Sequence, residues 1–239
     1  MQTPPTSETM RRAIRRCLRG TVLALLVVAV LGRVIPAVPW IEHLDLRLVA
    51  AANRALGPFT SELALRIDTV FGPPMAAAVA LLVMLVCVVL GCGARAGLRA
   101  GLLIAVPWGL VAVLKLMVQR PRPEPGLLVH QLVPIPSSFS FPSGHTAFAA
   151  AICCAVLLTL RPGAARRLGT VPAVIVVAVT AWSRVALGVH HPTDVLASAM
   201  LVPFVCVLLS GPLDLVLPVR HDGAGGDRLR NREEVARHG

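Results

Sequence analysis

Charged side chains are scarce in this sequence, at 15% of its 239 residues, against about a quarter in soluble globular domains. So few charged groups cannot cover a protein surface with water-facing side chains, which argues against an ordinary soluble domain. Aromatic residues amount to only 4%, and tyrosine is absent. Lysine occurs once, as Lys115, so the other 22 basic residues are arginine.

The sequence also lacks the spacings of a metal or disulfide scaffold. No Cys-x-x-Cys pair or Cys/His metal spacing is present, and the six cysteines lie within or beside apolar runs. We expect them to pack as small apolar side chains, without a structural disulfide. The net charge of +11 would suit nucleic acid, but the arginines are scattered between apolar runs rather than gathered in one basic domain. We therefore expect no nucleic-acid partner.

Long apolar runs dominate instead, with 56% of the residues hydrophobic. A membrane-spanning helix needs about 20 largely apolar residues. The sequence predicts an all-α fold, an integral membrane bundle of six transmembrane helices, at approximately Gly20–Ile41, Pro73–Cys92, Leu98–Val118, His145–Leu160, Thr170–Val189 and Val195–Leu213. The first run, interrupted by Arg33, also resembles a secretory signal with a cleavage site at Val49–Asn53.

The positions of the basic residues predict the orientation of this bundle. If six helices alternate, 15 of the 23 basic residues fall on one side, which should be the cytoplasm. We expect a multi-pass cell-membrane protein with both termini cytoplasmic. We expect the chain to divide into a basic N-terminus (1–19), a membrane domain (20–217) and a tail (218–239). The tail should be disordered because its glycines lie among charged residues.

Two longer connections are predicted on the opposite, extracytoplasmic face. In Glu42–Gly72, the four-residue spacing of Leu44, Leu48 and Ala52 indicates a short helix, lying either in the membrane interface or on the solvated surface. Gln119–Ser143 is rich in Pro and Ser, so packing rather than regular structure should order it.

Three polar clusters interrupt the apolar pattern: "KLMVQRPRP" from Lys115, "PSGH" from Pro142, and "SRVALGVHHPTD" from Ser183. With six alternating helices, all three lie at the extracytoplasmic ends of helices three to six. Lys115, Arg122 and Arg184 would thus face a single nearby carboxylate, Asp194. A helix N-terminus attracts anions, a glycine allows the backbone to approach a ligand, and arginine matches phosphate oxygens. The cluster therefore predicts a phosphate site around Gly144.

Two histidines can supply the chemistry. Asp194, four residues after His190, can fix its tautomer, which leaves the other ring nitrogen free to attack phosphorus. His145 can protonate the departing oxygen. We interpret His191 as loop surface or a helix cap. A metal site in "HHPTD" is an alternative, disfavoured because this face lacks further carboxylates, so we expect no metal and no cofactor.

At these residues the sequence resembles the type 2 phosphatidic acid phosphatase superfamily, which is related to vanadium haloperoxidases. The signature of that family is Lys-x6-Arg-Pro, then Pro-Ser-Gly-His, then Ser-Arg-x5-His-x3-Asp. It is matched by Lys115 with Arg122-Pro123, by Pro142 to His145, and by Ser183-Arg184 with His190 and Asp194. The resemblance extends over approximately residues 44–213.

The resemblance implies metal-independent hydrolysis of a lipid phosphate in two steps. His190 would form a phosphohistidine, His145 would act as acid and then base, and the phosphate would be held by Lys115, Arg122, Ser143, Gly144 and Arg184. Undecaprenyl diphosphate, phosphatidic acid, phosphatidylglycerol phosphate or a prenyl-linked sugar phosphate all remain open as substrates, as does the oligomeric state. The alternatives are a phosphotransferase of the same family and a non-catalytic lipid-binding or transport protein.

Overall fold

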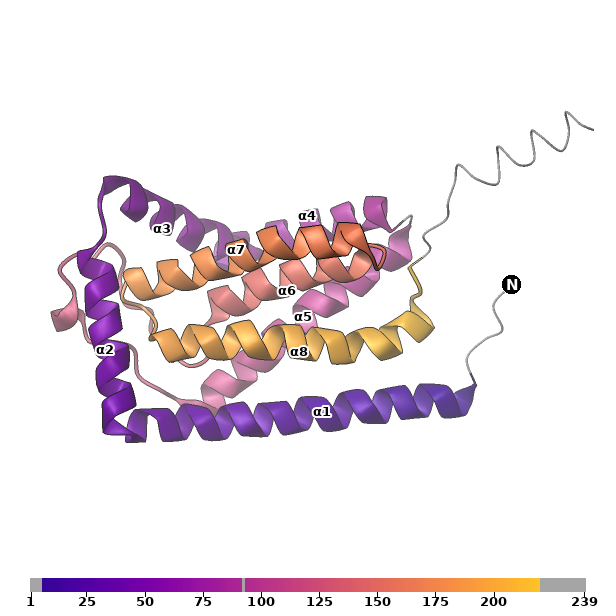
Figure 1. Ribbon diagram of the computed structural model, residues 1–239, viewed down its shortest axis with the longest axis horizontal. Helices are drawn as coiled ribbons and strands as arrows, with labels where there is room; N and C mark the ends of the chain where they lie inside the picture. The colour runs from indigo at the N-terminus through magenta and orange to yellow at the C-terminus, as the bar shows by residue number, and fades with distance from the viewer. Residues whose placement is uncertain (1–5, 92, 220–239) are drawn as a thin grey trace, which may run out of the picture.

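The computed structural model describes residues 6–91 and 93–219, and all regular structure within them is helical (Figure 1). The helices are α1 (Ser7–Val34), α2 (Pro39–Arg54), α3 (Pro58–Phe71), α4 (Pro73–Leu90), α5 (Ala94–Val118), α6 (Gly144–Thr159), α7 (Ala164–Ala186) and α8 (Pro192–Val216), with 3-10 turns η1 (Ile35–Ala37) and η2 (Pro125–Leu127). The prediction of an all-α fold is confirmed.

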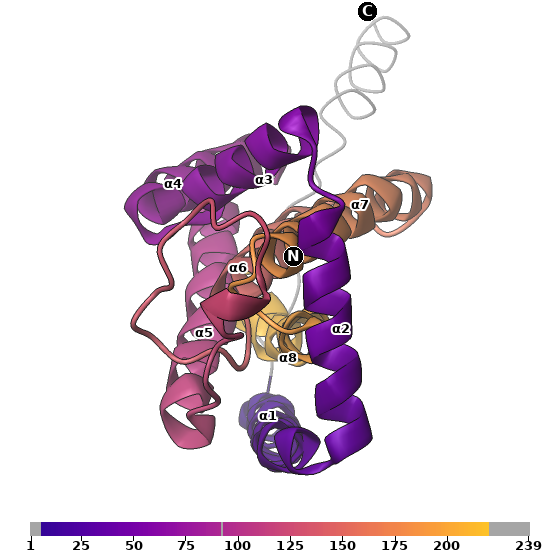
Figure 2. The same cartoon turned by 90° about the vertical axis from the view of Figure 1, so that its left-hand side faces the viewer.

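Helix α6 forms the centre of the bundle and packs against α4, α5, α7 and α8. The run Thr146–Ile152 is buried without interruption, because four alanines in it let the neighbouring helices approach closely. Helix α1 packs along α8 on one side of this core, as Figures 1 and 2 show. The outward faces of α1, α4 and α7 expose many Leu and Val side chains, which is the surface that lipid would solvate.

Five helical segments are long and apolar enough to cross a membrane, namely Ser7–Ala37, Pro73–Leu90, Ala94–Val118, Ala164–Ala186 and Pro192–Val216. The predicted membrane character is therefore supported, whereas the count of six spanning helices is not confirmed. The sixth apolar helix, α6, has only 16 residues, fewer than the roughly 20 that a spanning helix needs.

The predicted connection Glu42–Gly72 contains two helices, α2 and α3. The predicted helix near Leu44 exists, but its buried stripe consists of Asp45, Val49 and Asn53, while Leu44 and Leu48 are exposed. Asn53 is buried because its amide is fully bonded: Nδ2 donates to the carbonyls of His130 and Ala186, and Oδ1 accepts from the N–H groups of Val129 and His130, all at 2.9 Å.

Helix α2 and the connection between α5 and α6 cover one end of the bundle, which faces the viewer in Figure 2. That connection contains only η2, as the composition predicts. The other end carries the basic starts of α1, α5 and α7. Helix α1 begins at Ser7, so the arginines from Arg11 to Arg19 lie on the helix itself. Nearly all of the tail predicted to be disordered lies outside the described residues.

Candidate active site

Four helix ends meet beneath α2 and bring the three polar clusters together. They are the C-terminal ends of α5 and α7 and the N-terminal ends of α6 and α8. A cavity of about 520 Å³ lies at this end of the bundle. Of the predicted site residues, five line it: Lys115, Arg122, Gly144, His145 and His190. Residues separated by up to 75 positions in the chain thus share one cavity, as the alternation of helices predicts.

His190 lies in the tight turn between α7 and α8. Gly188 has a φ of +70°, a conformation that favours glycine. The carbonyl of Arg184 accepts the N–H groups of Val189 and His190 at 3.2 and 3.3 Å. These bonds hold the imidazole at the cavity with its ring almost fully buried.

The two ring nitrogens of His190 have different surroundings. Nδ1 lies 3.5 Å from Asp194 Oδ2 and 3.4 Å from Ser140 Oγ, while Nε2 lies 3.3 Å from Arg122. Burial, together with the charges of Arg122 and Lys115, lowers the pKa of His190 to about 3, although the bond to Asp194 opposes this shift. The imidazole is therefore neutral at pH 7. With its proton on Nδ1, the ring has its lone pair on Nε2, where it accepts a hydrogen bond from Arg122.

Arg120 anchors Asp194, and the sequence interpretation missed it. The Arg120 guanidinium is buried and donates to Asp194 Oδ1 at 2.8 Å, to Asp45 Oδ2 at 2.9 Å and to Glu42. A further bond at 2.7 Å reaches the hydroxyl of Thr193, which itself donates to Asp45. Arg120 therefore ties Asp194 to helix α2.

Asp194 Oδ2 receives a second set of donors. The hydroxyl of Ser140 donates to it, as does the backbone N–H of His191 at 2.8 Å. His191 is the N-cap of α8, and its ring Nδ1 lies 3.2 Å from the same oxygen. The predicted helix cap is thus confirmed, whereas the predicted loop surface is wrong because His191 is buried.

Lys115 and Arg122 form the cationic wall of the cavity. Lys115 Nζ donates to the carbonyls of Phe139 and Ser140 at 2.6 and 3.3 Å. Arg122 donates to the carbonyl of Ser138 at 2.8 Å, to its hydroxyl at 3.0 Å, and to the carbonyl of Val189. Because these acceptors are neutral, they position both cations without cancelling their charge. Burial lowers the pKa of Arg122 to about 10, which leaves it protonated at pH 7.

The two predicted residues at the start of α6 have different surroundings. Gly144 lines the cavity, and a Cβ added to it would lie 3.8 Å from Lys115 Cε, so the helix start passes close to the ammonium stem. Ser143 is the N-cap: its buried hydroxyl accepts from the hydroxyl of Thr146 at 3.1 Å and from its N–H at 3.5 Å. The Ser143 side chain thus stabilises the helix start and does not line the cavity.

Asp68 on α3 is a second site residue that the sequence interpretation missed. Its Oδ1 accepts from Arg184 and lies 3.3 Å from Nε2 of His145. Hydrogen bonding to His145, followed by the charge of Arg184, lowers the pKa of Asp68 to about 2. Arg184 is almost fully buried and does not line the cavity, so it lies behind Asp68 with its charge already balanced.

The rest of the cavity wall is largely apolar. It includes Phe71, Pro73 and Pro74 at the junction of α3 and α4, and Trp108, Val111 and Ala112 on α5. Such a wall suits an alkyl chain attached to a charged headgroup. Among residues 6–91 and 93–219, no three His, Cys, Asp or Glu side chains are grouped so as to hold a metal ion.

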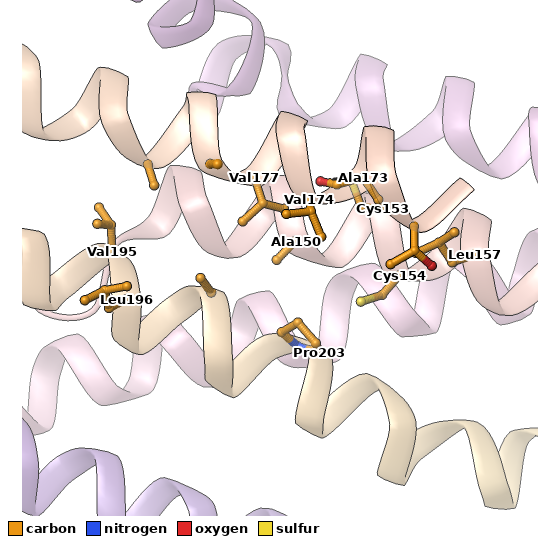
Figure 3. A pocket seen from close by; sticks show the side chains of 14 residues that line it. Ala150, Cys153, Cys154, Leu157, Ala173, Val174, Val177, Val195, Leu196 and Pro203 are labelled. Atoms are coloured by element: carbon orange, nitrogen blue, oxygen red, sulfur yellow. Dashed lines mark hydrogen bonds between the residues drawn. The ribbon is translucent and has the colours of Figure 1, made fainter. Parts of the chain in front are cut away.

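A separate apolar groove of about 390 Å³ runs between α6, α7 and α8 (Figure 3). Ala150, Cys153 and Cys154 of α6 line its floor, and Val174 and Leu196 belong to its two sides. None of the site residues lines it. The groove is therefore distinct from the site cavity.

The chain is similar to known proteins in both sequence and structure. A family model described as the PAP2 superfamily matches residues 96–210, which contain all three polar clusters. The structure resembles the crystal structure of a transmembrane PAP2-type phosphatidylglycerolphosphate phosphatase from Bacillus subtilis, with a TM-score of 0.65 and 24% identity over 82% of this chain and 94% of that one. The similarity shows that the two proteins share a fold.

Three curated relatives are similar in sequence. An undecaprenyl-diphosphatase of Bacillus subtilis is 36% identical over 44% of this chain and 52% of its own length. A decaprenylphosphoryl-5-phosphoribose phosphatase of Mycobacterium tuberculosis is 33% identical, over 58% and 67%, and a phosphatidylglycerophosphatase B of Bacillus subtilis is 34% identical, over 46% and 57%. The matches span about half to two thirds of these relatives.

Proposed function

The chain belongs to the PAP2 superfamily, and on that premise we propose that it is an integral membrane phosphatase that releases the terminal phosphate of a lipid phosphate. The observation that carries the proposal is the cavity in which a neutral imidazole, His190, lies beside two cations, Lys115 and Arg122, that are held by hydrogen bonds to neutral backbone carbonyls. A phosphate bound to the cations would lie within reach of His190 Nε2.

The proposed reaction has two steps. In the first, the Nε2 lone pair attacks phosphorus, the bond from phosphorus to the leaving oxygen breaks, and His145 gives its proton to that oxygen. Asp194 holds the Nδ1 proton and balances the positive charge that develops on the ring. In the second step, water attacks the phosphohistidine, His145 takes a proton from the water, and the phosphorus–nitrogen bond breaks. Inorganic phosphate leaves and His190 is neutral again.

The remaining predicted residues would stabilise charge on the transferring group. Lys115, Arg122 and the free N–H groups at the start of α6, beginning at Gly144, would donate to the equatorial oxygens. Ser143 would act by fixing that helix start. Arg184 would act in one of two ways. It would either hold Asp68, whose carboxylate it shares with His145, or exchange its bond to Asp68 for a bond to a phosphate oxygen.

We further propose that the site faces the extracytoplasmic side and that both termini are cytoplasmic. The support is the concentration of arginines at the opposite end of the bundle, on the starts of α1, α5 and α7. The apolar cavity wall near Trp108 would contact the lipid chain, while the headgroup reaches the cations. Substrate would then enter laterally from the bilayer.

The test is phosphate release by the detergent-purified protein from phosphatidic acid, phosphatidylglycerol phosphate and undecaprenyl diphosphate, without an added acceptor. His190→Ala should lower turnover by at least about a thousandfold while its unfolding temperature and elution volume match wild type. The matched control is His43→Ala, the same change on the exposed face of α2. Phosphate release by His190→Ala at the wild-type rate would refute the proposed nucleophile, and release that requires an acceptor lipid would identify a transferase.

A further inference from the structure

Helix α2 lies across the end of the bundle that contains the site cavity. Figure 1 shows its axis crossing the ends of the other helices, and Figure 2 shows it at one edge of that end. Its inner side is fixed to the site: Asp45 Oδ1 accepts the backbone N–H of Thr193 at 3.2 Å, in the first turn of α8. Glu42 and Asp45 also bind Arg120, which holds Asp194. Helix α2 therefore lies at the level of Asp194 and hence of the site.

The outer side of α2 carries an exposed apolar stripe, which we call the α2 stripe. Trp40, Leu44 and Leu48 follow one another at four-residue spacing, so their side chains lie on one side of the helix. Their exposed fractions are 69%, 46% and 45%. Exposure of such large apolar side chains to water is unfavourable. A contiguous apolar patch of this kind marks a contact with a membrane or with another protein.

The charges of α2 are divided between its two sides in a way that favours a lipid surface. Its two acidic residues, Glu42 and Asp45, face inward and bind Arg120. Its two arginines, Arg47 and Arg54, are exposed. The outer side thus presents cations without a carboxylate from the same helix, which complements the phosphates of lipid headgroups. Arginine beside a stripe of tryptophan and leucine is typical of a helix that lies in a membrane interface.

The α2 stripe also continues the lipid-facing surface of α1. Helix α1 exposes Val30, Leu31 and Val34 in its last turns. The residues from Ile35 to Pro39, which connect it to α2, are all apolar, and Trp40 comes directly after them. The chain therefore passes from the exposed apolar side of α1 to the α2 stripe without a polar residue between them. A bilayer that covers the first surface reaches the second at its edge.

From these observations we infer that α2 is an interfacial helix, whose outer side rests in the headgroup region of the leaflet at the site end of the bundle. The α2 stripe faces the acyl chains, and the two arginines contact the headgroup phosphates. This placement does not depend on the proposed hydrolysis. Where the proposed function holds, the same depth puts His190 and Asp194 at the level of the lipid phosphates. A headgroup then reaches the site while its lipid stays in the bilayer.

Quenching of Trp40 fluorescence in nanodiscs tests this placement. The chain has three tryptophans, so Trp108→Phe with Trp182→Phe leaves Trp40 as the only one. Phosphatidylcholine brominated near its ester groups should quench Trp40 more strongly than lipid brominated at the chain ends, and more strongly than iodide in the water. Strong quenching by iodide with little by any brominated lipid would identify a solvated helix. No quenching by either would identify a side covered by protein, such as a second copy of the chain. Both results overturn the inference.

A second measurement compares stabilities of variants at one position of the stripe. Leu44→Glu inserts a charge that would lose hydration in a membrane interface, so its unfolding temperature in nanodiscs should fall by on the order of 2–4 °C. The control Leu44→Phe keeps the position apolar and should match wild type. On a solvated surface Leu44→Glu costs nothing, so an unfolding temperature equal to or above that of wild type would overturn the inference. Neither measurement uses turnover, so a failure to release phosphate would refute the proposed function and leave this test intact.

Discussion

Replacing Arg120 by methionine would remove the one cation that holds three carboxylates at the site. Arg120 donates to Asp194, Asp45 and Glu42, and all of these except Glu42 are almost fully buried. Methionine fills a similar volume but leaves Asp45 and Asp194 without their ion-pair partner. Both carboxylates keep other donors, so we expect the fold to survive in a weakened form.

The expected loss follows from the burial of this network. Removing one partner of a buried ion pair typically costs about 3–5 kcal/mol, because the remaining charge stays desolvated. For a protein of this length, that loss corresponds to a fall in unfolding temperature on the order of 6–20 °C. Catalysis should suffer as well: Asp194 would no longer be held from its Oδ1 side, so kcat should fall more than KM rises.

Thermal unfolding in detergent is monitored by tryptophan fluorescence. Steady-state kinetics are measured on the lipid phosphate that the wild-type protein hydrolyses fastest. The control Arg66→Met breaks the exposed pair with Glu62, and exposed pairs are worth only about 0–1 kcal/mol. Adding Asp45→Asn to Arg120→Met removes one buried carboxylate that has lost its ion-pair partner, so it should recover part of the stability. An Arg120→Met protein that unfolds at the wild-type temperature with an unchanged kcat would refute this account of the network.

Two further predictions concern protons and metals. Because the pKa of His190 is about 3 in the folded protein and near 6.5 when unfolded, only the unfolded state binds its proton between these values. Stability should therefore fall as the pH drops from about 6.5 to 3, and His190→Gln should reduce that slope in unfolding temperature against pH. Since His190 stays neutral, it should not itself impose an acid limb on kcat/KM between pH 7 and 4. The charges of Arg122 and Lys115 lower the pKa of His190, so a limb in that range that moved to higher pH on neutralising either cation would contradict this. Phosphate release should continue in excess EDTA and should be inhibited by vanadate, a phosphate mimic. Strong sensitivity to EDTA would instead favour a metal site in "HHPTD".

Sequence alone predicted the site residues whose relative positions depend on spacing along the chain. His190 and Asp194 lie four positions apart across a helix start, and Pro142 to His145 open a helix, so local geometry brings these groups together. The apolar runs set the alternation of the helices, which places Lys115 and Arg122 at the same end of the bundle. These inferences need only helical periodicity and the thickness of a bilayer.

Other features depended on contacts between distant segments. Asp68 meets Arg184 across 116 positions and Arg120 meets Glu42 across 78, and no spacing rule links such pairs. The sequence pattern predicts a span at His145–Leu160, where the structure has a helix of 16 residues, α6, that its neighbours largely bury. Folding decided these points because a buried charge is tolerated only beside a partner. Which carboxylates of α2 and α3 reach the buried arginines is set by how those helices pack over the end of the bundle.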